Sequence, residues 1–282
     1  MTGDVRGRVA AAAHRLAAAG VPSPRTDAEL LAAHVLGLGR GRLALAGAMS
    51  PAQQVRYERL VAARARRVPL QHLTGTTAFG HLDLAVGPGV FVPRPETELL
   101  AQWATGTGGR LAVDLCSGSG ALALAIAHGL PEAKVYAVES APPALRWLRR
   151  NAAARAAAGD TPVRVVAGDA TDPAVLAQLD GTVDLVVCNP PYVPSGVAVP
   201  PEVRRDPAEA VFAGADGLAV ITPAIARAGS LLRPGGAFGI EHDDSHGEAV
   251  PRLLRRDGLF TRIADHRDLA GRPRFATAVR AG

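Results

Sequence analysis

Residues 111–120 read LAVDLCSGSG and decide the fold class. The apolar run Leu111–Leu115 is typical of a buried strand, and the apolar segment 121–128 that follows the glycines predicts a helix. The glycines between them let the backbone turn sharply and bring amide N–H groups close to a ligand at the start of the helix. The stretch therefore predicts a strand, a ligand-binding loop and a helix in succession.

The same rhythm repeats along the rest of the chain. Further strands are predicted at residues 135–138, 163–166, 183–188, 237–240, 260–263 and 275–279, and a further helix at 142–157. Alternating strands and helices favour a parallel sheet covered by helices on both faces, which is a doubly wound α/β fold. In such sheets ligands lie beyond the carboxyl ends of the strands, where the strand order reverses.

The N-terminal quarter has a different texture. Three short helices are predicted there, at residues 5–19, from Thr26 or Asp27 to Leu36, and from the capping Ser50 to about Arg67. Residues 1–67 contain eleven arginines against four acidic residues, whereas the rest of the chain is slightly acidic. Such a surface can bind an acidic partner or RNA. Solvated helix faces explain it more simply, because no aromatic residues interleave with the arginines.

Composition excludes several classes of protein. The 282 residues are 48% hydrophobic and 20% charged, which does not fit a disordered chain. No apolar run approaches the roughly 18 residues that span a bilayer, and charges interrupt the first twenty residues, so no signal peptide is expected. The two cysteines, Cys116 and Cys188, are too few for a disulfide framework or a structural zinc site. We expect a cytoplasmic protein without a metal site.

Two acidic residues follow neighbouring predicted strands. Glu139 ends one strand, and a carboxylate there can accept hydrogen bonds from both hydroxyls of a ribose, which suits NAD or S-adenosylmethionine. Asp169 follows the next strand, where it either closes the adenine side of a pocket or serves only in a turn. Residues 118–123, GSGALA, match the dinucleotide pattern G-x-G-x-x-G/A, which by itself is a weak signal.

The segment Asn189-Pro190-Pro191-Tyr192 directly follows the predicted strand 183–188. Its prolines fix the backbone, so the side-chain oxygen of Asn189 and the carbonyl of Pro190 lose little freedom on binding. These two oxygens can accept both hydrogens of a planar –NH2 group, and Tyr192 can lie against the plane that carries it. The segment thus predicts methylation of an amide or an exocyclic amine through proximity and electrostatics, without a strong base.

With these motifs the chain resembles the peptide chain release factor N5-glutamine methyltransferases, of the class I group that uses S-adenosylmethionine. Further resemblance lies in residues 69–75, 91–98, 216–218, 233–236, Glu241 and 268–274. It implies a Rossmann-like seven-stranded methyltransferase sheet at residues 93–282. It also implies a helical substrate-recognition domain at residues 1–75 and a connecting hairpin at residues 76–92.

The resemblance implies methyl transfer to the side-chain amide (N5) of the glutamine in the Gly-Gly-Gln motif of release factors. Asn189, Pro190 and Tyr192 would be catalytic, and together with Pro191 they would hold the glutamine. Donor contacts would fall on Cys116, Ser117, Gly118, Ser119, Gly120, Glu139, Asp169, Ala170 and Asn189. Cys116 stands where the family usually has glycine, and Glu139 where it usually has aspartate. The expected partner is a release factor, near the ribosome, with no membrane and no direct DNA binding.

Three alternatives remain open from the sequence. An N6-adenine nucleic-acid methyltransferase shares Asn-Pro-Pro-Tyr but normally carries a larger target-recognition region with basic and aromatic residues. An NAD-dependent oxidoreductase fits the glycine pattern and Glu139 and leaves residues 189–192 unexplained. A binding module without turnover would not need the intact motifs.

Overall fold

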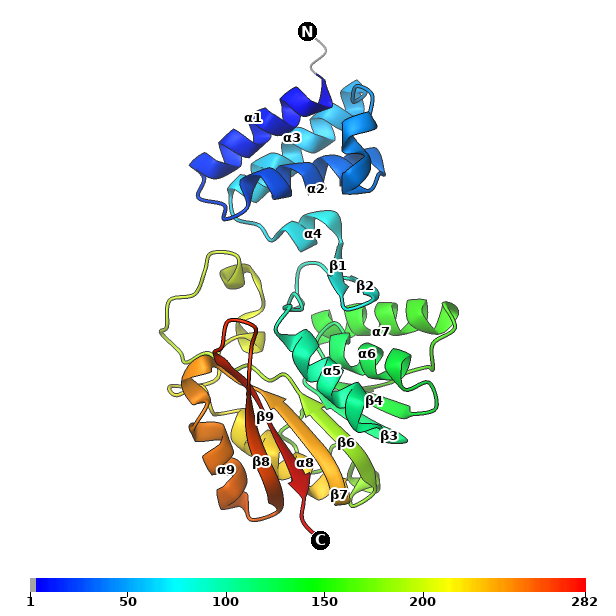
Figure 1. Ribbon diagram of the computed structural model, residues 1–282, viewed down its shortest axis with the longest axis vertical. Helices are drawn as coiled ribbons and strands as arrows, with labels where there is room; N and C mark the ends of the chain where they lie inside the picture. Colours follow the sequence, from blue (N-terminus) through cyan, green and yellow to red (C-terminus); the bar gives the residue numbers. More distant parts are fainter. Residues whose placement is uncertain (1–3) are drawn as a thin grey trace. The chain divides into compact units, whose positions relative to one another are not determined.

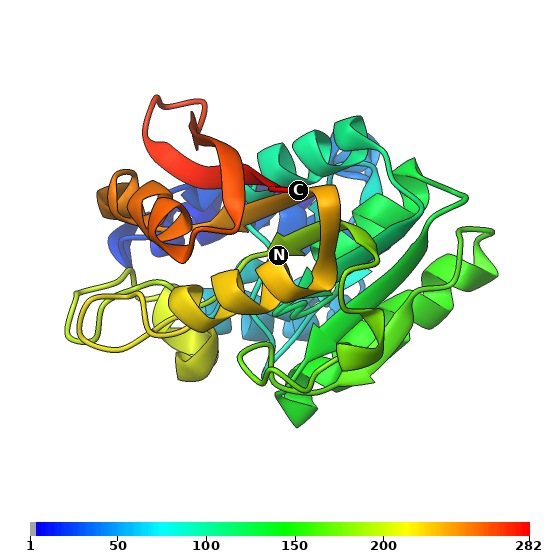
Figure 2. The ribbon, with the colours of Figure 1, turned by 90° about the horizontal axis from the view of Figure 1, so that it is seen from below.

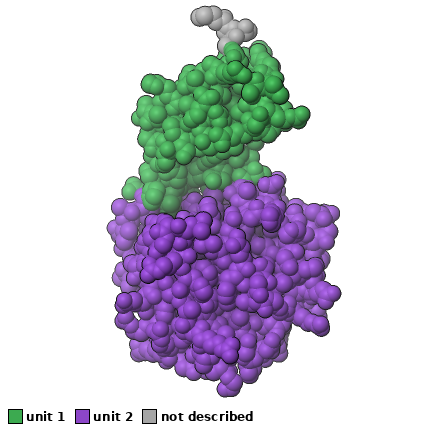
Figure 3. Space-filling view, viewed as in Figure 1, with its two compact units in different colours: residues 1–76, 200–205 green, residues 77–199, 206–282 purple. Residues whose placement is uncertain are grey.

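The computed structural model describes residues 4–282 and divides them into two compact units (Figure 3). The helical unit comprises the chain up to Thr76 together with the short segment Pro200–Arg205. The sheet unit comprises Thr77–Val199 and Asp206–Gly282. The chain therefore passes from one unit to the other three times. Among residues 4–282, no helix is long and apolar enough to cross a membrane.

The described part of the helical unit contains four α-helices: α1 (Val5–Ala18), α2 (Pro24–Leu36), α3 (Pro51–Ala65) and α4 (Leu70–Thr74). Single-turn and short 3-10 segments lie at Arg40–Leu45 and Val203–Arg205. The core gathers apolar faces of α1, α2 and α3 around Leu16, Leu31 and Tyr57, which are fully buried. The Tyr57 hydroxyl donates to the Ala28 carbonyl at 3.1 Å, so this buried polar group is satisfied.

Two predicted helix ends differ from those observed. Helix α2 begins at Pro24 with Ser23 as its N-cap residue, not at Thr26 or Asp27, because proline suits the first helical position. Asp27 is instead buried against α3. Helix α3 does begin after Ser50, whose side chain and that of Gln53 form a reciprocal capping box, but it ends at Ala65 and not at Arg67.

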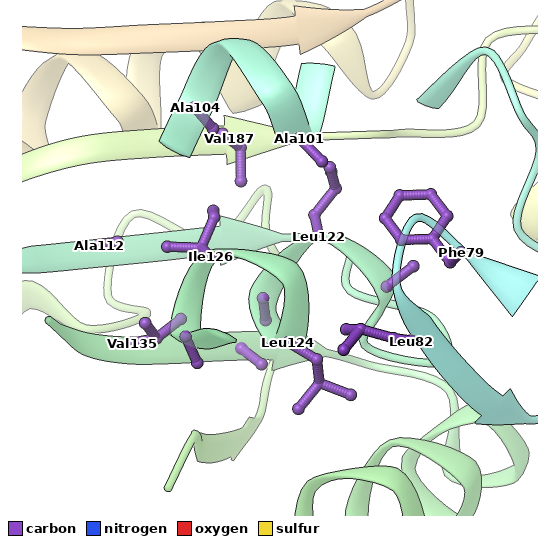
Figure 4. Close-up of a cluster of buried hydrophobic side chains, with 14 of the residues drawn as sticks. Phe79, Leu82, Ala101, Ala104, Ala112, Leu122, Leu124, Ile126, Val135 and Val187 are labelled. Atoms are coloured by element: carbon purple, nitrogen blue, oxygen red, sulfur yellow. The ribbon is translucent and has the colours of Figure 1, made fainter. Parts of the chain in front are cut away.

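A two-stranded hairpin, β1 (Thr76–Phe79) and β2 (Leu82–Ala85), precedes the main sheet. Phe79 and Leu82 pack into the same buried cluster as Leu122 and Ile126 (Figure 4). The side chain of Asn151 hydrogen-bonds both the N–H and the C=O of Ala85, at 2.8 and 2.9 Å. The hairpin is thereby fixed to the sheet unit by apolar packing and by one buried amide.

The main sheet has seven strands in the order β5-β4-β3-β6-β7-β9-β8 (Figure 1). The strands are β3 (Leu111–Leu115), β4 (Lys134–Glu139), β5 (Arg164–Ala167), β6 (Val183–Cys188), β7 (Leu232–Glu241), β8 (Phe260–Arg267) and β9 (Pro273–Arg280). The α/β class and the seven strands agree with the sequence. The expectation of an entirely parallel sheet is wrong at one end, because β9 runs antiparallel to both β7 and β8. A short turn joins β8 to β9, and such a turn can only connect antiparallel neighbours.

Helices cover both faces of the sheet. One buried cluster contains side chains of α5 (Thr97–Thr107), α6 (Ala121–Gly129) and α7 (Pro142–Ala157). The other contains side chains of α8 (Ile221–Leu231) and α9 (Ala249–Asp257). Figure 2 shows α8, in gold, running along its face of the sheet. Central strands such as β6 are buried on both sides, which explains the continuous apolar sequence of residues 185–188.

Candidate active site

The strand order reverses between β3 and β6, and this reversal creates the site. The two strands are parallel neighbours, with Leu115 opposite Cys188 in the register. The glycine-rich loop that begins at Cys116 and the segment that begins at Asn189 therefore leave the same edge of the sheet side by side. A doubly wound sheet binds its ligands at this reversal.

The loop after β3 is shaped by backbone conformations that favour glycine. Gly118 and Gly120 have φ of +55° and +91°, in the left-handed region. A Cβ on Gly120 would lie 2.6 Å from Cδ1 of Leu148, so this glycine lets α7 pack closely. A Cβ on Gly118 would meet nothing within 4 Å, so at this position the requirement is the backbone turn and not close packing.

Cys116 occupies a left-handed conformation as well, with φ of +62°. For a residue with a side chain this conformation carries a cost of roughly 1–2 kcal/mol. The usual glycine of the resembled family would avoid that cost. Burial and the neighbouring Cys116 raise the pKa of the Cys188 thiol, so Cys188 stays a protonated packing group and not a nucleophile.

Glu139 lies at the carboxyl end of β4 and braces the glycine-rich loop. One carboxylate oxygen accepts from the Gly118 N–H at 2.8 Å, and the other accepts from the Ala141 N–H at 2.8 Å. Each carboxylate oxygen has two acceptor directions, so both retain capacity for a hydroxyl donor. The contact brings Glu139 and the glycine-rich loop together at this edge of the sheet.

Asp114 is buried beneath the same loop. Its Oδ2 accepts from the Ala123 N–H at 3.1 Å, in the first turn of α6. Burial raises the pKa of this carboxyl to about 7, against the opposing effect of its hydrogen bonds with Ser117 and Ala123. Sequence reasoning gave Asp114 no role, because a single aspartate at the end of an apolar strand carries no sign of its burial.

Asp169 and Ala170 follow β5. The Oδ1 of Asp169 accepts from both the N–H and the hydroxyl of Thr171, at 2.8 and 2.7 Å, which is the turn geometry that the sequence left open. Asp169 is exposed, whereas Ala170 is buried. The Gly168 N–H donates to the Glu139 carbonyl at 3.0 Å, so this turn lies beside the end of β4.

Asn189 is oriented by a residue from the opposite end of the sheet unit's sequence. Its Nδ2 donates to the hydroxyl of Thr97 at 3.1 Å, across 92 positions of chain. The Thr97 hydroxyl also lies close to Glu241 at the end of β7 and lowers the pKa of that carboxyl. In the bond between Asn189 and Thr97, the amide N–H donates and the hydroxyl accepts. The amide of Asn189 is thereby fixed with its Oδ1 available as an acceptor.

Tyr192 belongs to the same network. Its hydroxyl donates to Oε1 of Glu241 at 2.9 Å, and the negative charge of Glu241 together with burial raises the pKa of Tyr192. Burial also raises the pKa of Glu241 to about 6, although the hydroxyls of Thr97 and Tyr192 and the nearby charge of Arg274 lower it. The segment 189–192 is thus fastened at both ends, Asn189 to Thr97 and Tyr192 to the buried Glu241.

Thr97, Glu241 and Arg274 are residues whose roles sequence reasoning missed. All three lie in segments that carry the family resemblance, but their spacing along the chain gives no sign that they meet. Thr97 is 3% exposed and Glu241 is 1% exposed, so both are unusual as buried polar groups. The available signal was Glu241 at the end of the apolar strand β7, because a buried polar group there needs a partner.

Comparison with known proteins identifies relatives along nearly the whole chain. Residues 9–75 match the family model of the PrmC N-terminal domain, and residues 81–204 match that of the methyltransferase small domain. A protein of Mycolicibacterium smegmatis named release factor glutamine methyltransferase is 52% identical over 280 residues, covering 98% of each chain. A protein of the same name from Streptomyces coelicolor is 47% identical, covering 97% of each chain. A solved O-methyltransferase family protein of Burkholderia thailandensis is 15% identical with a TM-score of 0.47, covering 67% of this chain and 57% of that chain.

Proposed function

Because the chain belongs to the release factor glutamine methyltransferase family, we propose that it methylates the side-chain amide nitrogen of a glutamine in a release factor. The glutamine would be that of the Gly-Gly-Gln motif, and S-adenosylmethionine would be the methyl donor. The observation that carries this proposal is the orientation of Asn189 by Thr97 at 3.1 Å, which offers an oxygen acceptor at the sheet edge. A primary amide is the ligand that such a site suits.

Asn189 and Pro190 would bind the acceptor. The Asn189 Oδ1 and the Pro190 carbonyl can each accept one hydrogen of the glutamine –NH2, so the amide plane is held in one orientation. An amide nitrogen is a weak nucleophile, and holding it in line with the methyl donor supplies much of the rate. Pro191 stiffens the turn, and Tyr192 provides a surface for the amide plane while Glu241 fixes its hydroxyl.

The residues of the donor side fit S-adenosylmethionine. The loop Cys116–Gly120 leaves β3 with left-handed turns, and the hydroxyl of Ser119 is buried without a hydrogen-bond partner. Glu139 retains acceptor capacity suited to ribose hydroxyls, and Ser117, Gly118, Gly120, Asp169, Ala170 and Asn189 would complete the donor contacts. When bound, S-adenosylmethionine supplies an electrophilic methyl group on a sulfonium. The chain's own contribution is to orient the acceptor and to exclude water.

The helical unit would recognise the release factor. A groove there is lined by Arg6, by Arg25 and Arg40, which share the carboxylate of Glu29, and by the apolar Val9 and Leu43. Its combination of positive charge and apolar surface suits an acidic and apolar patch of a protein partner. Residues 1–75 would thus form the recognition domain, 76–92 the connection and 93–282 the catalytic domain. Translation termination would place the enzyme in the cytoplasm near ribosomes, without direct DNA binding.

Mass spectrometry of a purified release factor tests the proposal. After incubation with the enzyme and S-adenosylmethionine, we expect one added methylene mass on the glutamine of the Gly-Gly-Gln motif. A release factor with glutamate at that position is the matched control and should stay unmodified. DNA and RNA incubated in parallel should gain no methyl group, and methylation of adenine in their place would contradict the assignment.

A further inference from the structure

Two arginines of the helical unit, Arg64 and Arg67, bind the carboxylate of Glu202. Its two carboxylate oxygens accept from Nε and Nη2 of Arg67, at 2.6 and 2.7 Å, in the bidentate geometry that gives the strongest arginine–carboxylate pairs. Oε1 also accepts from Nη2 of Arg64 at 2.8 Å. Only 17% of the Glu202 side chain is exposed. One carboxylate thus receives three charged hydrogen bonds.

Further hydrogen bonds hold Arg64 and Arg67 in place. Arg64 is 5% exposed, and its Nε donates to Asp27 of α2 at 2.7 Å while its Nη1 donates to the Val68 carbonyl. Arg67 uses its remaining Nη1 to donate to the Gly20 carbonyl at 3.0 Å. These bonds orient both guanidinium groups independently of Glu202. The hydrogen bonds of Arg67 and Arg64 lower the pKa of Glu202 to about 2, so its charge persists at neutral pH.

The chain adopts a strained conformation directly after α3, at Arg67, and this residue pairs with Glu202. The Arg67 N–H donates to the Arg64 carbonyl and the Val68 N–H to the Ala63 carbonyl, which is the Schellman pattern. Glycine is the usual residue at the left-handed position of that pattern, but here Arg67 occupies it with φ of +63°. A non-glycine residue is retained at such a position when its side chain is needed there.

The segment Pro200–Arg205, which contains Glu202, is the tip of a loop that starts at the acceptor site. The loop leaves directly after Tyr192, and a bridge between Val193 and Phe212 closes its neck. The residue after the segment, Asp206, is buried and paired with Arg94 at 2.5 Å in the sheet unit. The tip belongs to the helical unit, whereas both ends of the loop belong to the sheet unit.

We propose that Glu202 is a positioning residue that anchors the tip of the loop 194–211 in the helical unit, so that the segment 200–205 and the helices of that unit receive the protein substrate as one surface. This inference rests on the proposed function for its substrate, and on the ion pairs of Glu202 for its geometry. The donor side takes no part in it, because the anchor begins ten residues after Tyr192 on the acceptor side. Loss of the anchor affects recognition of the release factor and spares donor binding.

The test compares Glu202→Gln with Glu209→Gln in the full-length enzyme. Glu209 lies in the same loop and is exposed, which makes it a matched control for the loss of a carboxylate. For Glu202→Gln we expect amide hydrogen exchange in 194–199 to accelerate about tenfold and the KM for release factor to rise about tenfold, the effect of losing one good charged hydrogen bond. The kcat and the Kd for S-adenosylmethionine should stay within about twofold of wild type, and Glu202→Asp should restore part of the KM.

Each other outcome overturns the anchor. Unchanged exchange in the loop would show that Glu202 does not restrain it, and this readout needs no activity. Faster exchange with an unchanged KM would show a restraint without a role in recognition. If Glu202→Gln lowers the melting temperature of the helical unit, the variant Arg67→Lys provides the test instead. Lysine keeps the positive charge but cannot form the bidentate pair with Glu202. A wild-type KM in Arg67→Lys therefore contradicts the proposal. A wild-type enzyme inactive on release factor would refute the proposed function while the exchange result still stands.

Discussion

The donor loop, residues 116–120, and the acceptor segment, residues 189–192, leave neighbouring strands at one sheet edge, yet they are held in different ways. The donor loop is shaped locally, by left-handed backbone turns and by backbone N–H groups that donate to Glu139 and Asp114. The acceptor segment is held by side chains from distant elements, Thr97 and Glu241. The donor side is thus destabilised by the left-handed conformation of Cys116 and by the buried carboxyl of Asp114. The acceptor side depends on the orientation of one amide, that of Asn189.

This difference predicts which measured property changes when a residue on each side is substituted. Changes at the donor loop should appear chiefly in the free energy of unfolding. Changes at the acceptor segment and its supports should appear chiefly in kcat. The four variants below test this division, and they are ordered by the free energy that each is expected to change.

Asp114→Asn should give the largest change, in the pH dependence of stability. The pKa of Asp114 is about 7 in the folded protein against an ordinary 3.8, so between these pH values the folded state keeps a proton that the unfolded state has lost. The contribution of Asp114 to the stability of the wild type should therefore fall as pH rises from 4 to 7, by up to about 4 kcal/mol at about 1.4 kcal/mol per unit.

Asparagine cannot titrate, so denaturant unfolding of Asp114→Asn should show a flatter pH profile. Burial also raises the pKa values of Glu241 and Asp206, to about 6 each, so a smaller slope should remain below pH 6. A variant with the full wild-type slope would show that Asp114 does not carry the buried-charge cost of the donor side.

Asn189→Ala should lower kcat by roughly ten- to hundredfold, because losing a hydrogen bond in the reacting complex costs about 1–3 kcal/mol. The Kd for S-adenosylmethionine, measured by calorimetry, should change far less. An equal loss of donor affinity would show that Asn189 acts mainly through the donor and not through the acceptor amide, and would remove the contrast between the two segments.

Thr97→Val should lower kcat about tenfold, since it leaves Asn189 free to rotate and removes a partner worth about 1.4 kcal/mol. Valine keeps the shape of threonine and lacks the hydroxyl. Thr97→Ser keeps the hydroxyl and is the matched control, so steady-state kinetics should show kcat close to wild type. If serine and valine behave alike, the hydroxyl does not orient Asn189.

Cys116→Gly should give the smallest change, a gain in stability of about 0.5–1 kcal/mol. Glycine relieves the left-handed strain at φ +62°, but part of the gain is lost to the greater freedom of the unfolded chain. Thermal unfolding should show a higher melting temperature. Cys116→Ala is the control, because alanine keeps the Cβ, and a gain of the same size there would assign the effect to the sulfur.

The same contrast explains what the sequence could predict. The strand–loop–helix order around Gly118 and Gly120 is local information, so the fold class, the seven strands and the place of the site could be predicted. The roles of Thr97 and Glu241 could not, because Thr97 lies 92 positions from Asn189 and Glu241 lies 49 from Tyr192, and these pairs meet only after the sheet forms. The antiparallel β9 escaped prediction for a similar reason, since strand direction depends on the connection and not on the apolar pattern.

The three passages of the chain between the two units have a consequence for modular exchange. A fragment that stops at Thr76 would keep Arg64 and Arg67 and would lose the glutamate that neutralises them. Such a fragment would present Arg67 without a carboxylate partner beside Arg64, which would keep only Asp27. Recombination that swaps the N-terminal helices between relatives would therefore have to carry the short segment 200–205 along, and this ties the evolution of two distant stretches of the gene together.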